Sequence, residues 1–332
     1  MSVTRASFFL CSGGLEKIDK EHVCLKIILF LCILLTQVSM EHKAGFVNII
    51  GNPNVGKSTL MNILVGEKLS IITSKAQTTR HRIQGIVSGE NFQLIYSDTP
   101  GILNPHYKLQ EKMLRFIELA LEDADILLYV TDVKEKYDKN EEYLGRIRKA
   151  SVPVIVVINK IDLSREEDLQ KLINLWQETL PGATIIPASA KEGHNLSAIY
   201  EKILELLPES PPYYPKDALT NRTERFFVAE IIREKIFMSF KKEVPYSTEV
   251  QIEEFKDQED LLSIRANIIV MRNSQKAILI GAKGEAIKRV GTQAREELEA
   301  LYEKKVFLDL YVKVHKEWRD KEGFLRSSGY NQ

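Results

Sequence analysis

The chain has 332 residues, more than one compact core normally holds, which indicates about two domains. Its content of 44% hydrophobic and 28% charged residues is typical of a folded globular protein and excludes large-scale disorder. Lysine and arginine together number 46, as do aspartate and glutamate, so any basic surface must be local. All three cysteines lie within residues 1–32, which excludes disulfides, thiolate metal sites and cysteine nucleophiles from the rest of the chain and predicts a cytoplasmic protein.

The first 40 residues contain a 16-residue apolar stretch, residues 23–38, that three polar residues interrupt. This stretch is shorter than the roughly 20 residues that span a bilayer. A signal peptide is disfavoured because the stretch starts late and no small-residue cleavage site follows it. Three interpretations stay open: translation starts at Met40, the segment anchors the protein to a membrane, or it is a tolerated extension.

From Phe46 to about Leu207, apolar runs of strand length alternate with amphipathic stretches of helix length. The expected strands are Phe46–Ile50, Arg82–Val87, Phe92–Ser97, Ile126–Thr131, Val154–Ile158 and Thr184–Ile186. The expected helices are Lys57–Leu64, Leu109–Leu121, Asn140–Lys149, Glu166–Thr179 and Leu196–Leu206. This alternation predicts an α/β fold with a mostly parallel sheet, helices on both faces, and ligands at the carboxyl ends of the strands.

A proline-rich segment then ends the alternation. Residues 208–215 contain four prolines, which forbid a helix and predict an extended, semi-rigid connector. The following α+β pattern is expected to comprise Glu224–Phe240, Thr248–Phe255, Leu262–Val270, a helix pair around Gly281–Gly284, and Val306–Val314. The predicted divisions are an N-terminal extension (1–40), a nucleotide-binding domain (41–207), a linker (208–222) and a second domain (223–332).

The clearest motif is GNPNVGKS, which fits G-x-x-x-x-G-K-[ST] between an apolar strand and a helix. Its glycines let successive N–H groups point at phosphate oxygens, and the helix start adds a favourable dipole. Lys57 is expected to neutralise β- and γ-phosphate charge, and the Ser58 hydroxyl to ligate Mg²⁺. The predicted phosphate-binding residues are Gly51, Asn52, Pro53, Asn54, Val55, Gly56, Lys57, Ser58 and Thr59.

A second motif, DTPG, follows a predicted strand about 40 residues after the first. Its aspartate suits a role beside Mg²⁺, through a water molecule, while the glycine N–H can approach the γ-phosphate. The residues expected at the nucleotide are Asp98, Thr99, Pro100 and Gly101.

Between these two motifs lies the polar sequence QTTR, which starts at Gln77. A mobile loop here could supply a threonine to Mg²⁺ only while the γ-phosphate is present, which would make a switch. Thr79 is the predicted ligand and Thr78 the alternative. The same residues could instead form an exposed turn that binds no ligand.

The sequence NKID, after another predicted strand, indicates selection of the base. Guanine offers two adjacent donors, N1–H and the N2 amino group, and a carboxylate accepts both. Adenine lacks this pair and would leave buried polar groups unmatched, so Asp162 favours GTP over ATP. Main-chain donors in SAK would complete the pocket. The expected base-site residues are Asn159, Lys160, Asp162, Ser189, Ala190 and Lys191.

In the second domain, residues 278–287 contain two glycines three positions apart between helical patterns. The G-x-x-G spacing lets a phosphodiester backbone lie against exposed N–H groups, although an ordinary helix turn has the same spacing. From Arg265 to Arg295 there are seven basic residues and one acidic residue, a local charge of +6 that suits a phosphate backbone. The predicted residues at a single-stranded nucleic acid are Gly281, Ala282, Lys283, Gly284, Lys288 and Arg289.

The motif order GNPNVGKS, QTTRH, DTPG, NKID and SAK resembles the Era group of translation-factor-related GTPases, and the second domain resembles a type II KH domain. The resemblance runs from about Ala44 to Tyr330. It implies Mg²⁺-dependent hydrolysis of GTP to GDP and phosphate, binding of 16S ribosomal RNA near its 3′ end, and a role in 30S subunit assembly. It also implies peripheral association with the inner face of the cell membrane. We expect a monomer.

Ile102 follows DTPG, where many signalling GTPases have a water-orienting glutamine. An isoleucine cannot orient water, and the sequence contains no identifiable general base, so slow intrinsic turnover is expected. Catalytic assistance is then limited to the γ-phosphate stabilisers Lys57, Thr79 and Gly101. Asn54 resembles the P-loop asparagine that ligates a monovalent cation in some relatives, which implies K⁺ as a second candidate cation.

Three other functions would each require particular features of the chain. A tRNA-modifying or tandem GTPase would need a C-terminal cysteine or a second G-x-x-x-x-G-K-[ST], and neither occurs. A membrane-bound GTPase would be anchored through Leu25–Leu35. A passive RNA-binding scaffold with a vestigial nucleotide site would show no GTP turnover.

Overall fold

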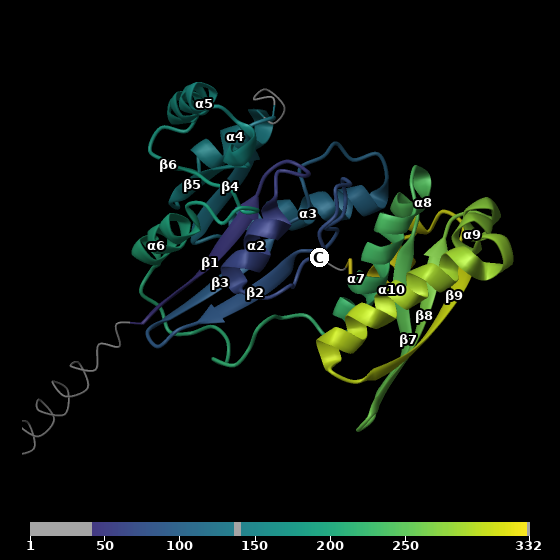
Figure 1. Ribbon diagram of the computed structural model, residues 1–332. Coiled ribbons are helices and arrows are strands. Elements are labelled where there is room, and N and C mark those ends of the chain that lie inside the picture. The colour runs from purple at the N-terminus through teal and green to yellow at the C-terminus, as the bar shows by residue number, and fades with distance from the viewer. Residues whose placement is uncertain (1–41, 136–140, 331–332) are drawn as a thin grey trace, which may run out of the picture. The chain divides into compact units, whose positions relative to one another are not determined.

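The computed structural model describes residues 42–135 and 141–330, so the apolar segment within residues 1–40 lies outside the described residues. The described chain forms two sheets (Figure 1), one of six strands and one of three. None of the helices within these ranges combines the length and the apolar character that crossing a bilayer requires.

The six-stranded sheet has the order β2-β3-β1-β4-β5-β6, and β2 alone is antiparallel to its neighbour. Its strands are β1 (Lys43–Ile50), β2 (Ile83–Ser88), β3 (Phe92–Asp98), β4 (Ile126–Asp132), β5 (Val154–Asn159) and β6 (Thr184–Pro187). The helices around it are α2 (Lys57–Val65), α3 (Lys108–Glu122), α4 (Glu141–Arg148), α5 (Glu166–Thr179) and α6 (Leu196–Leu206). The predicted α/β fold is confirmed.

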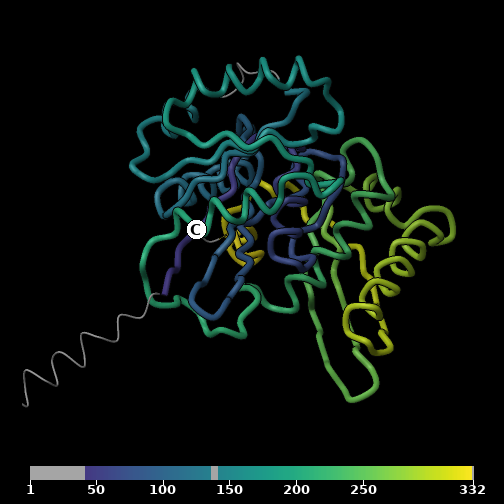
Figure 2. The backbone as a smooth tube through the Cα atoms, turned by 60° about the vertical axis from the view of Figure 1, so that its left-hand side comes forward, coloured from purple at the N-terminus to yellow at the C-terminus, as the bar shows by residue number. Residues whose placement is uncertain are grey.

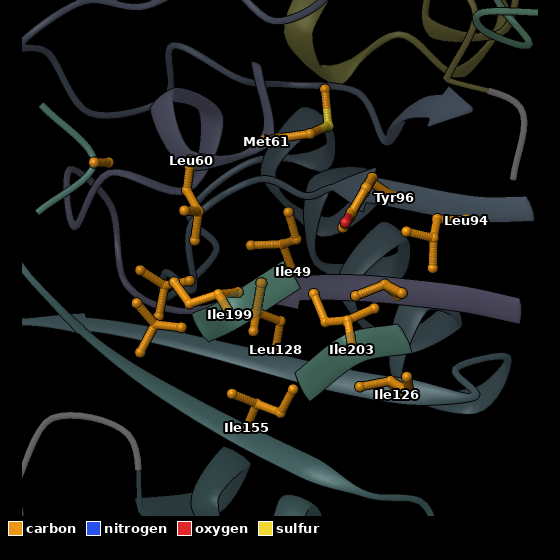
Figure 3. Close-up of a cluster of buried hydrophobic side chains, with 14 of the residues drawn as sticks. Ile49, Leu60, Met61, Leu94, Tyr96, Ile126, Leu128, Ile155, Ile199 and Ile203 are labelled. Atoms are coloured by element: carbon orange, nitrogen blue, oxygen red, sulfur yellow. The ribbon is translucent and has the colours of Figure 1, made fainter. Parts of the chain in front are cut away.

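Apolar side chains on both faces of this sheet explain why its strands read as continuous hydrophobic runs. All seven residues of β4 are buried, as a central parallel strand between two helical layers requires. Figure 3 shows one of these layers, in which Ile49 and Leu128 of the sheet meet Leu60 of α2 and Ile199 and Ile203 of α6. The last two are four residues apart and therefore share one helix face.

The three-stranded sheet has the order β7-β8-β9, with β7 antiparallel and β9 parallel to the central β8. Alternate β8 residues, among them Leu262 and Ile264, are buried against helices on one face. The strands of this sheet and the helices around it are α7 (Glu224–Ser239), β7 (Glu249–Asp257), β8 (Leu261–Val270), α9 (Asn273–Ile280), α10 (Glu285–Tyr302) and β9 (Lys305–Val314). The predicted α+β order is confirmed. The short helices α8 (Glu243–Tyr246) and α11 (Glu322–Ser327) were not predicted.

Residues 208–223, here called the strap, contain no helix, as the prolines predict, and turn at Pro215–Ala218. Their first residues bond to the start of β1, and Leu219 and Thr220 bond to the edge strand β2 (Figure 2). The N–H of Ile86 donates to the carbonyl of Leu219 at 2.8 Å, and the Thr220 hydroxyl donates to the carbonyl of Gln84 at 2.6 Å. The Gln93 side chain accepts the N–H groups of two consecutive strap tyrosines at 2.8 and 2.9 Å. The strap therefore covers an otherwise open sheet edge.

The C-terminal residues of the described chain close onto α3. Trp318, Leu325 and Tyr330 are fully buried in one apolar cluster with Phe116 and other α3 residues. The ring of Tyr330 also stacks on His81, with 4.1 Å between the centroids. Burial, followed by the nearby charges of three arginines, lowers the pKa of His81 well below 6.5, so the imidazole is neutral in this contact. Segments before β2 and after β9 therefore share one core.

Candidate functional site

The predicted motifs occupy loops at the carboxyl ends of strands in the six-stranded sheet. The P-loop (Gly51–Ser58) follows β1, DTPG begins at the last residue of β3, NKID begins at the last residue of β5, and SAK follows β6. The parallel register pairs Ile49 with Asp98 and Ile158 with Pro187, which aligns these strand ends. The loops are therefore close together although their residues are far apart in the sequence.

Gly101 shows how closely two of these loops approach. A Cβ at this position would lie 2.6 Å from the backbone nitrogen of Pro53 in the P-loop. The neighbouring Thr99 is buried and donates its hydroxyl to the carbonyl of Ile49 at 2.7 Å, which anchors the DTPG loop to β1. Pro100 is also buried. Thr99 and Pro100 thus shape the loop, and Gly101 is the member that can approach a phosphate.

Lys57 is only 6% exposed, and its ammonium donates to the carbonyls of Gly51 and Asn52 at 3.0 and 2.8 Å. Burial lowers the pKa of Lys57 to about 8, against the attraction of Asp98 and Glu135. A buried ammonium in a curled backbone loop is stabilised by an anion, so this arrangement fits phosphate.

Three oxygen-bearing side chains converge next to Lys57. The Ser58 hydroxyl donates to Asp98 Oδ2 at 2.6 Å and lies 2.9 Å from the Thr79 hydroxyl, which is itself 3.3 Å from Asp98 Oδ2. Asp98 Oδ1 is buried and has no hydrogen-bond partner within the described part of the chain. Burial also raises the pKa of Asp98. An orphaned carboxylate oxygen beside two hydroxyls fits a hard cation such as Mg²⁺.

Thr78, the alternative magnesium ligand, is used elsewhere. Its hydroxyl lies 2.6 Å from the Thr73 hydroxyl and donates to the carbonyl of Lys75 at 2.6 Å. Thr79 is 8% exposed, which argues against a merely exposed turn. Of the two threonines, the geometry favours Thr79.

A cavity of about 340 Å³ lies between the P-loop and residues 68–82, here called the switch segment. Thr59, Thr79 and Gly101 all line it. The Asn54 amide bridges its two walls by donating to the carbonyl of Ser74 at 3.2 Å. The switch segment therefore closes over the position expected for the phosphates.

At the base end, Asn159 braces three loops. Its amide nitrogen donates to the carbonyl of Val55 at 2.8 Å, and its amide oxygen accepts the N–H of Ala190 at 3.0 Å. Lys160 similarly donates to the carbonyl of Asn54 at 2.5 Å and to Asp132 at 2.6 Å. Asn159 thus holds the pocket walls together.

Asp162 is exposed and accepts a hydrogen bond from the Ser189 hydroxyl at 2.6 Å. This bond lowers the pKa of Asp162, which keeps the carboxylate ionised. The Lys191 side chain points to solvent and pairs with Glu192, so its expected contribution is limited to the main chain. An ionised acceptor at this position suits the two donors of guanine.

The sequence interpretation missed Glu135. Its carboxylate is hydrogen-bonded to the side chain of Asn52 and accepts the Thr131 hydroxyl at 2.6 Å. Glu135 therefore holds the second residue of the P-loop from the loop after β4. A carboxylate just beyond a buried strand was the only sequence signal for it.

Ile102 is turned into the core. It is 7% exposed and packs with Ile50, Ile117 and Leu127, while its N–H donates to the carbonyl of Gly51 at 3.2 Å. The side chain after DTPG therefore offers no polar group to the phosphate cavity, which agrees with the expectation from the sequence.

The G-x-x-G turn joins α9 to α10. Gly281 and Gly284 have φ values of 73° and 81°, and Lys283 between them has 48°. A Cβ on Gly281 would lie 2.7 Å from the Ala286 Cβ, whereas nothing lies within 4 Å of a Cβ on Gly284. The turn, which includes Ala282, is therefore closely packed at Gly281 and has free space at Gly284.

The basic residues near this turn are divided between more than one surface. Lys288 lines a groove of about 280 Å³ between α10 and β9, whereas Arg289 lines a separate hollow beside α7. Arg265 forms ion pairs with Glu254 and Asp309 at 3.5 and 3.6 Å. Adjacent helical positions point about 100° apart, which explains the separation of Lys288 from Arg289.

Comparison with known proteins assigns both parts of the chain. Residues 46–160 match the family of 50S ribosome-binding GTPases, and residues 243–319 match the KH domain. GTPase Era of Halothermothrix orenii is 44% identical over 88% of this chain and 99% of the relative. GTPase Era of Staphylococcus haemolyticus is 42% identical over 87% of this chain and 98% of the relative.

Two solved structures are similar over the same region. One is Era in complex with MgGDPNP and nucleotides 1506–1542 of 16S ribosomal RNA, with a TM-score of 0.83 and 41% identity over 87% of this chain and 99% of that chain. An Aquifex aeolicus Era variant bound to GDP·AlF4⁻ gives the same four values. With an α/β P-loop fold, a KH match and this level of identity, the chain belongs to the Era family of GTPases.

Proposed function

We propose that this protein is a GTP-controlled switch that binds 16S ribosomal RNA near its 3′ end and acts in assembly of the 30S subunit. The convergence of Ser58, Thr79 and Asp98 beside the phosphate cavity carries the proposal, because these three side chains would form a magnesium site that includes the switch segment. The relative crystallised with MgGDPNP and a 16S fragment supports the same ligands for this chain.

In this proposal, main-chain N–H groups of the P-loop and the Lys57 ammonium bind the triphosphate, and Asp162 selects guanine. Ser58 and Thr79 would hold Mg²⁺ directly and Asp98 through water. The ion would neutralise charge on the β- and γ-phosphates. Lys57, the Thr79 hydroxyl and the Gly101 N–H stabilise the γ-phosphate, and turnover is slow because Ile102 faces the core.

The proposal includes K⁺ as a second cation beside Asn54, whose amide already bridges the P-loop and the switch segment. It also includes a nucleotide-binding domain (41–207), a linker (208–222) and an RNA-binding KH domain (223–332). Each of the two domains contains a sheet with its own apolar cluster. A cytoplasmic monomer with peripheral association at the cell membrane completes the proposal, on the basis of the family resemblance.

Substitution Gly284→Asp is expected to abolish crosslinking of the protein to 16S ribosomal RNA in cells. Nothing lies within 4 Å of a Cβ at this position, so the added side chain strains the local backbone but meets no neighbour, and its carboxylate would lie where we propose that a phosphodiester binds. We expect a loss of RNA affinity of about tenfold or more, because each phosphate contact depends on charge. Crosslinking followed by RNA sequencing measures the result.

Gly182→Asp is the matched control. Gly182 also has a positive φ, 89°, and an open Cβ position, so both variants bear the same backbone strain. It lies between α5 and β6, in the six-stranded part of the chain. Unchanged 16S crosslinks in Gly284→Asp would remove the KH assignment of RNA binding.

A further inference from the structure

Arg80, immediately after the proposed magnesium ligand Thr79, is completely buried against the KH part of the chain. Its guanidinium donates four hydrogen bonds, all to residues between α8 and the start of β7. The acceptors are the carbonyls of Pro245 at 3.2 Å, Tyr246 at 3.2 Å and Thr248 at 2.7 Å, and Glu249 Oε2 at 3.1 Å. The rings of Phe237 and Trp318 lie 5.7 and 5.9 Å from the guanidinium carbon. This binding pocket fits a planar, fork-shaped cation.

A second arginine makes the reverse contact from the KH side. Arg233 of α7 is 1% exposed and donates to the carbonyl of Thr78 at 2.5 Å. Glu230, one turn earlier on α7, accepts the Arg233 Nε–H at 2.8 Å. Thr79 thus lies between Thr78, whose carbonyl is held by α7, and Arg80, whose side chain is held by α8 and β7.

The rest of the switch segment is attached to the same helix. Glu234 of α7 accepts the N–H of Ile72 at 3.1 Å and the ammonium of Lys68 at 2.9 Å. Lys75 donates to the carbonyls of Phe237 and Phe240. The KH part therefore holds the switch segment both before Thr79, at residues 68–75, and after it, at Arg80.

The two buried arginines and their two glutamate partners balance in charge. Arg80 and Arg233 contribute two positive charges, and Glu230 and Glu249 contribute two negative charges, all at 6% exposure or less. Tyr330 donates its hydroxyl to Glu249 at 3.1 Å. Because paired buried charges require precise geometry, this network defines one position of the switch segment more sharply than apolar packing alone would.

We infer that Arg80 is a positioning residue for GTP hydrolysis: docked in the KH part of the chain, it holds Thr79 where the hydroxyl meets Mg²⁺ and the γ-phosphate. The KH domain is then part of the hydrolytic machinery as well as an RNA-binding module. The inference rests on the proposed magnesium role of Thr79. Docking orders the segment before the reaction, so the loss of conformational entropy does not fall on the chemical step.

A comparison of GTP hydrolysis with GDP binding tests this role of Arg80. GDP has no γ-phosphate, so an effect that passes through Thr79 changes hydrolysis and binding of GDP·AlF4⁻ but leaves GDP affinity intact. In the full chain, Arg80→Ala is expected to lower the single-turnover rate of GTP hydrolysis about 100-fold, the scale of a misplaced catalytic group. GDP affinity should stay within about twofold of wild type, because the P-loop and base contacts are retained.

Arg225→Ala is the matched control, because Arg225 is an exposed arginine of α7 with one long hydrogen bond, 3.4 Å, to the carbonyl of Ile252. It should hydrolyse GTP at the wild-type rate. Millimolar guanidinium should partly restore Arg80→Ala by occupying the vacated pocket, whereas the same concentration of sodium chloride should not. Arg80→Lys should be intermediate, since an ammonium cannot reach all four acceptors.

Thermal unfolding shows whether each variant is folded, and Glu249→Gln, which removes one charge but keeps the shape, replaces Arg80→Ala if that variant does not fold. Wild-type hydrolysis by a folded Glu249→Gln or Arg80→Ala protein overturns the inference. An equal loss of GDP affinity also overturns it, because the role would then be structural. Lack of Mg²⁺-dependent turnover or 16S binding in the wild type would instead count against the proposed function.

Discussion

An Asp162→Asn variant is expected to lose most of its affinity for GTP and to gain affinity for XTP. The carboxylate accepts both donors on the edge of guanine, whereas an amide presents one acceptor and one donor. Xanthine offers N1–H and a carbonyl in place of the amino group, so it matches the amide. Leaving a hydrogen-bonding site mismatched costs about 10⁴-fold in discrimination. Asp162 is exposed and bonded to Ser189, so the substitution should not disturb the core.

Competition between GTP, ATP and XTP for a fluorescent nucleotide measures this inversion directly. Asp168→Asn is the control, because Asp168 is an exposed residue of α5 that pairs only weakly with Lys171 at 3.3 Å. It should keep the wild-type order of affinities. An Asp162→Asn protein that still prefers GTP would show that another group selects the base.

Lys57→Ala is expected to abolish measurable GTP turnover, with a loss of about 10³-fold or more. The Lys57 ammonium is the buried positive charge that two P-loop carbonyls hold at 3.0 and 2.8 Å. Alanine would leave those carbonyls and the phosphates without a counter-charge. Phosphate release under multiple-turnover conditions measures the effect, and Lys171→Ala, at an exposed lysine of α5, should hydrolyse GTP normally.

The same variant separates a switch from a passive scaffold. The KH part has its own apolar cluster, so Lys57→Ala should still bind a 16S fragment in the absence of nucleotide. Equal turnover in wild type and Lys57→Ala would favour an RNA-binding scaffold with a vestigial nucleotide site.

The elements and loops that the sequence predicts are those with local signals. Continuous apolar runs identify buried parallel strands, and the predicted and observed bounds of α5 and α6 coincide. The P-loop, DTPG and NKID could be located because phosphate, magnesium and guanine each require particular residue types at fixed spacing. The short helix α8 contains four residues, too few to show a helical period.

The docking of the switch segment could not be predicted, because its signals lie in pairs of residues more than 150 positions apart. Glu230, Arg233 and Glu234 read as a solvated helix face, since charged residues are seldom buried unless paired. Their partners in the switch segment carry no sequence mark of that pairing. The same holds for the basic residues around G-x-x-G, where composition gives a total charge but not the faces to which side chains point.

The strap has a consequence for dividing this protein into separate pieces. A fragment that stopped at Leu207 would keep every nucleotide motif but would expose the outer N–H and C=O groups of β2. An exposed edge strand can pair with strands of other molecules, so the fragment would self-associate. The shortest fragment expected to stay monomeric therefore extends past Thr220. It is longer than the segment that contains the nucleotide-binding motifs.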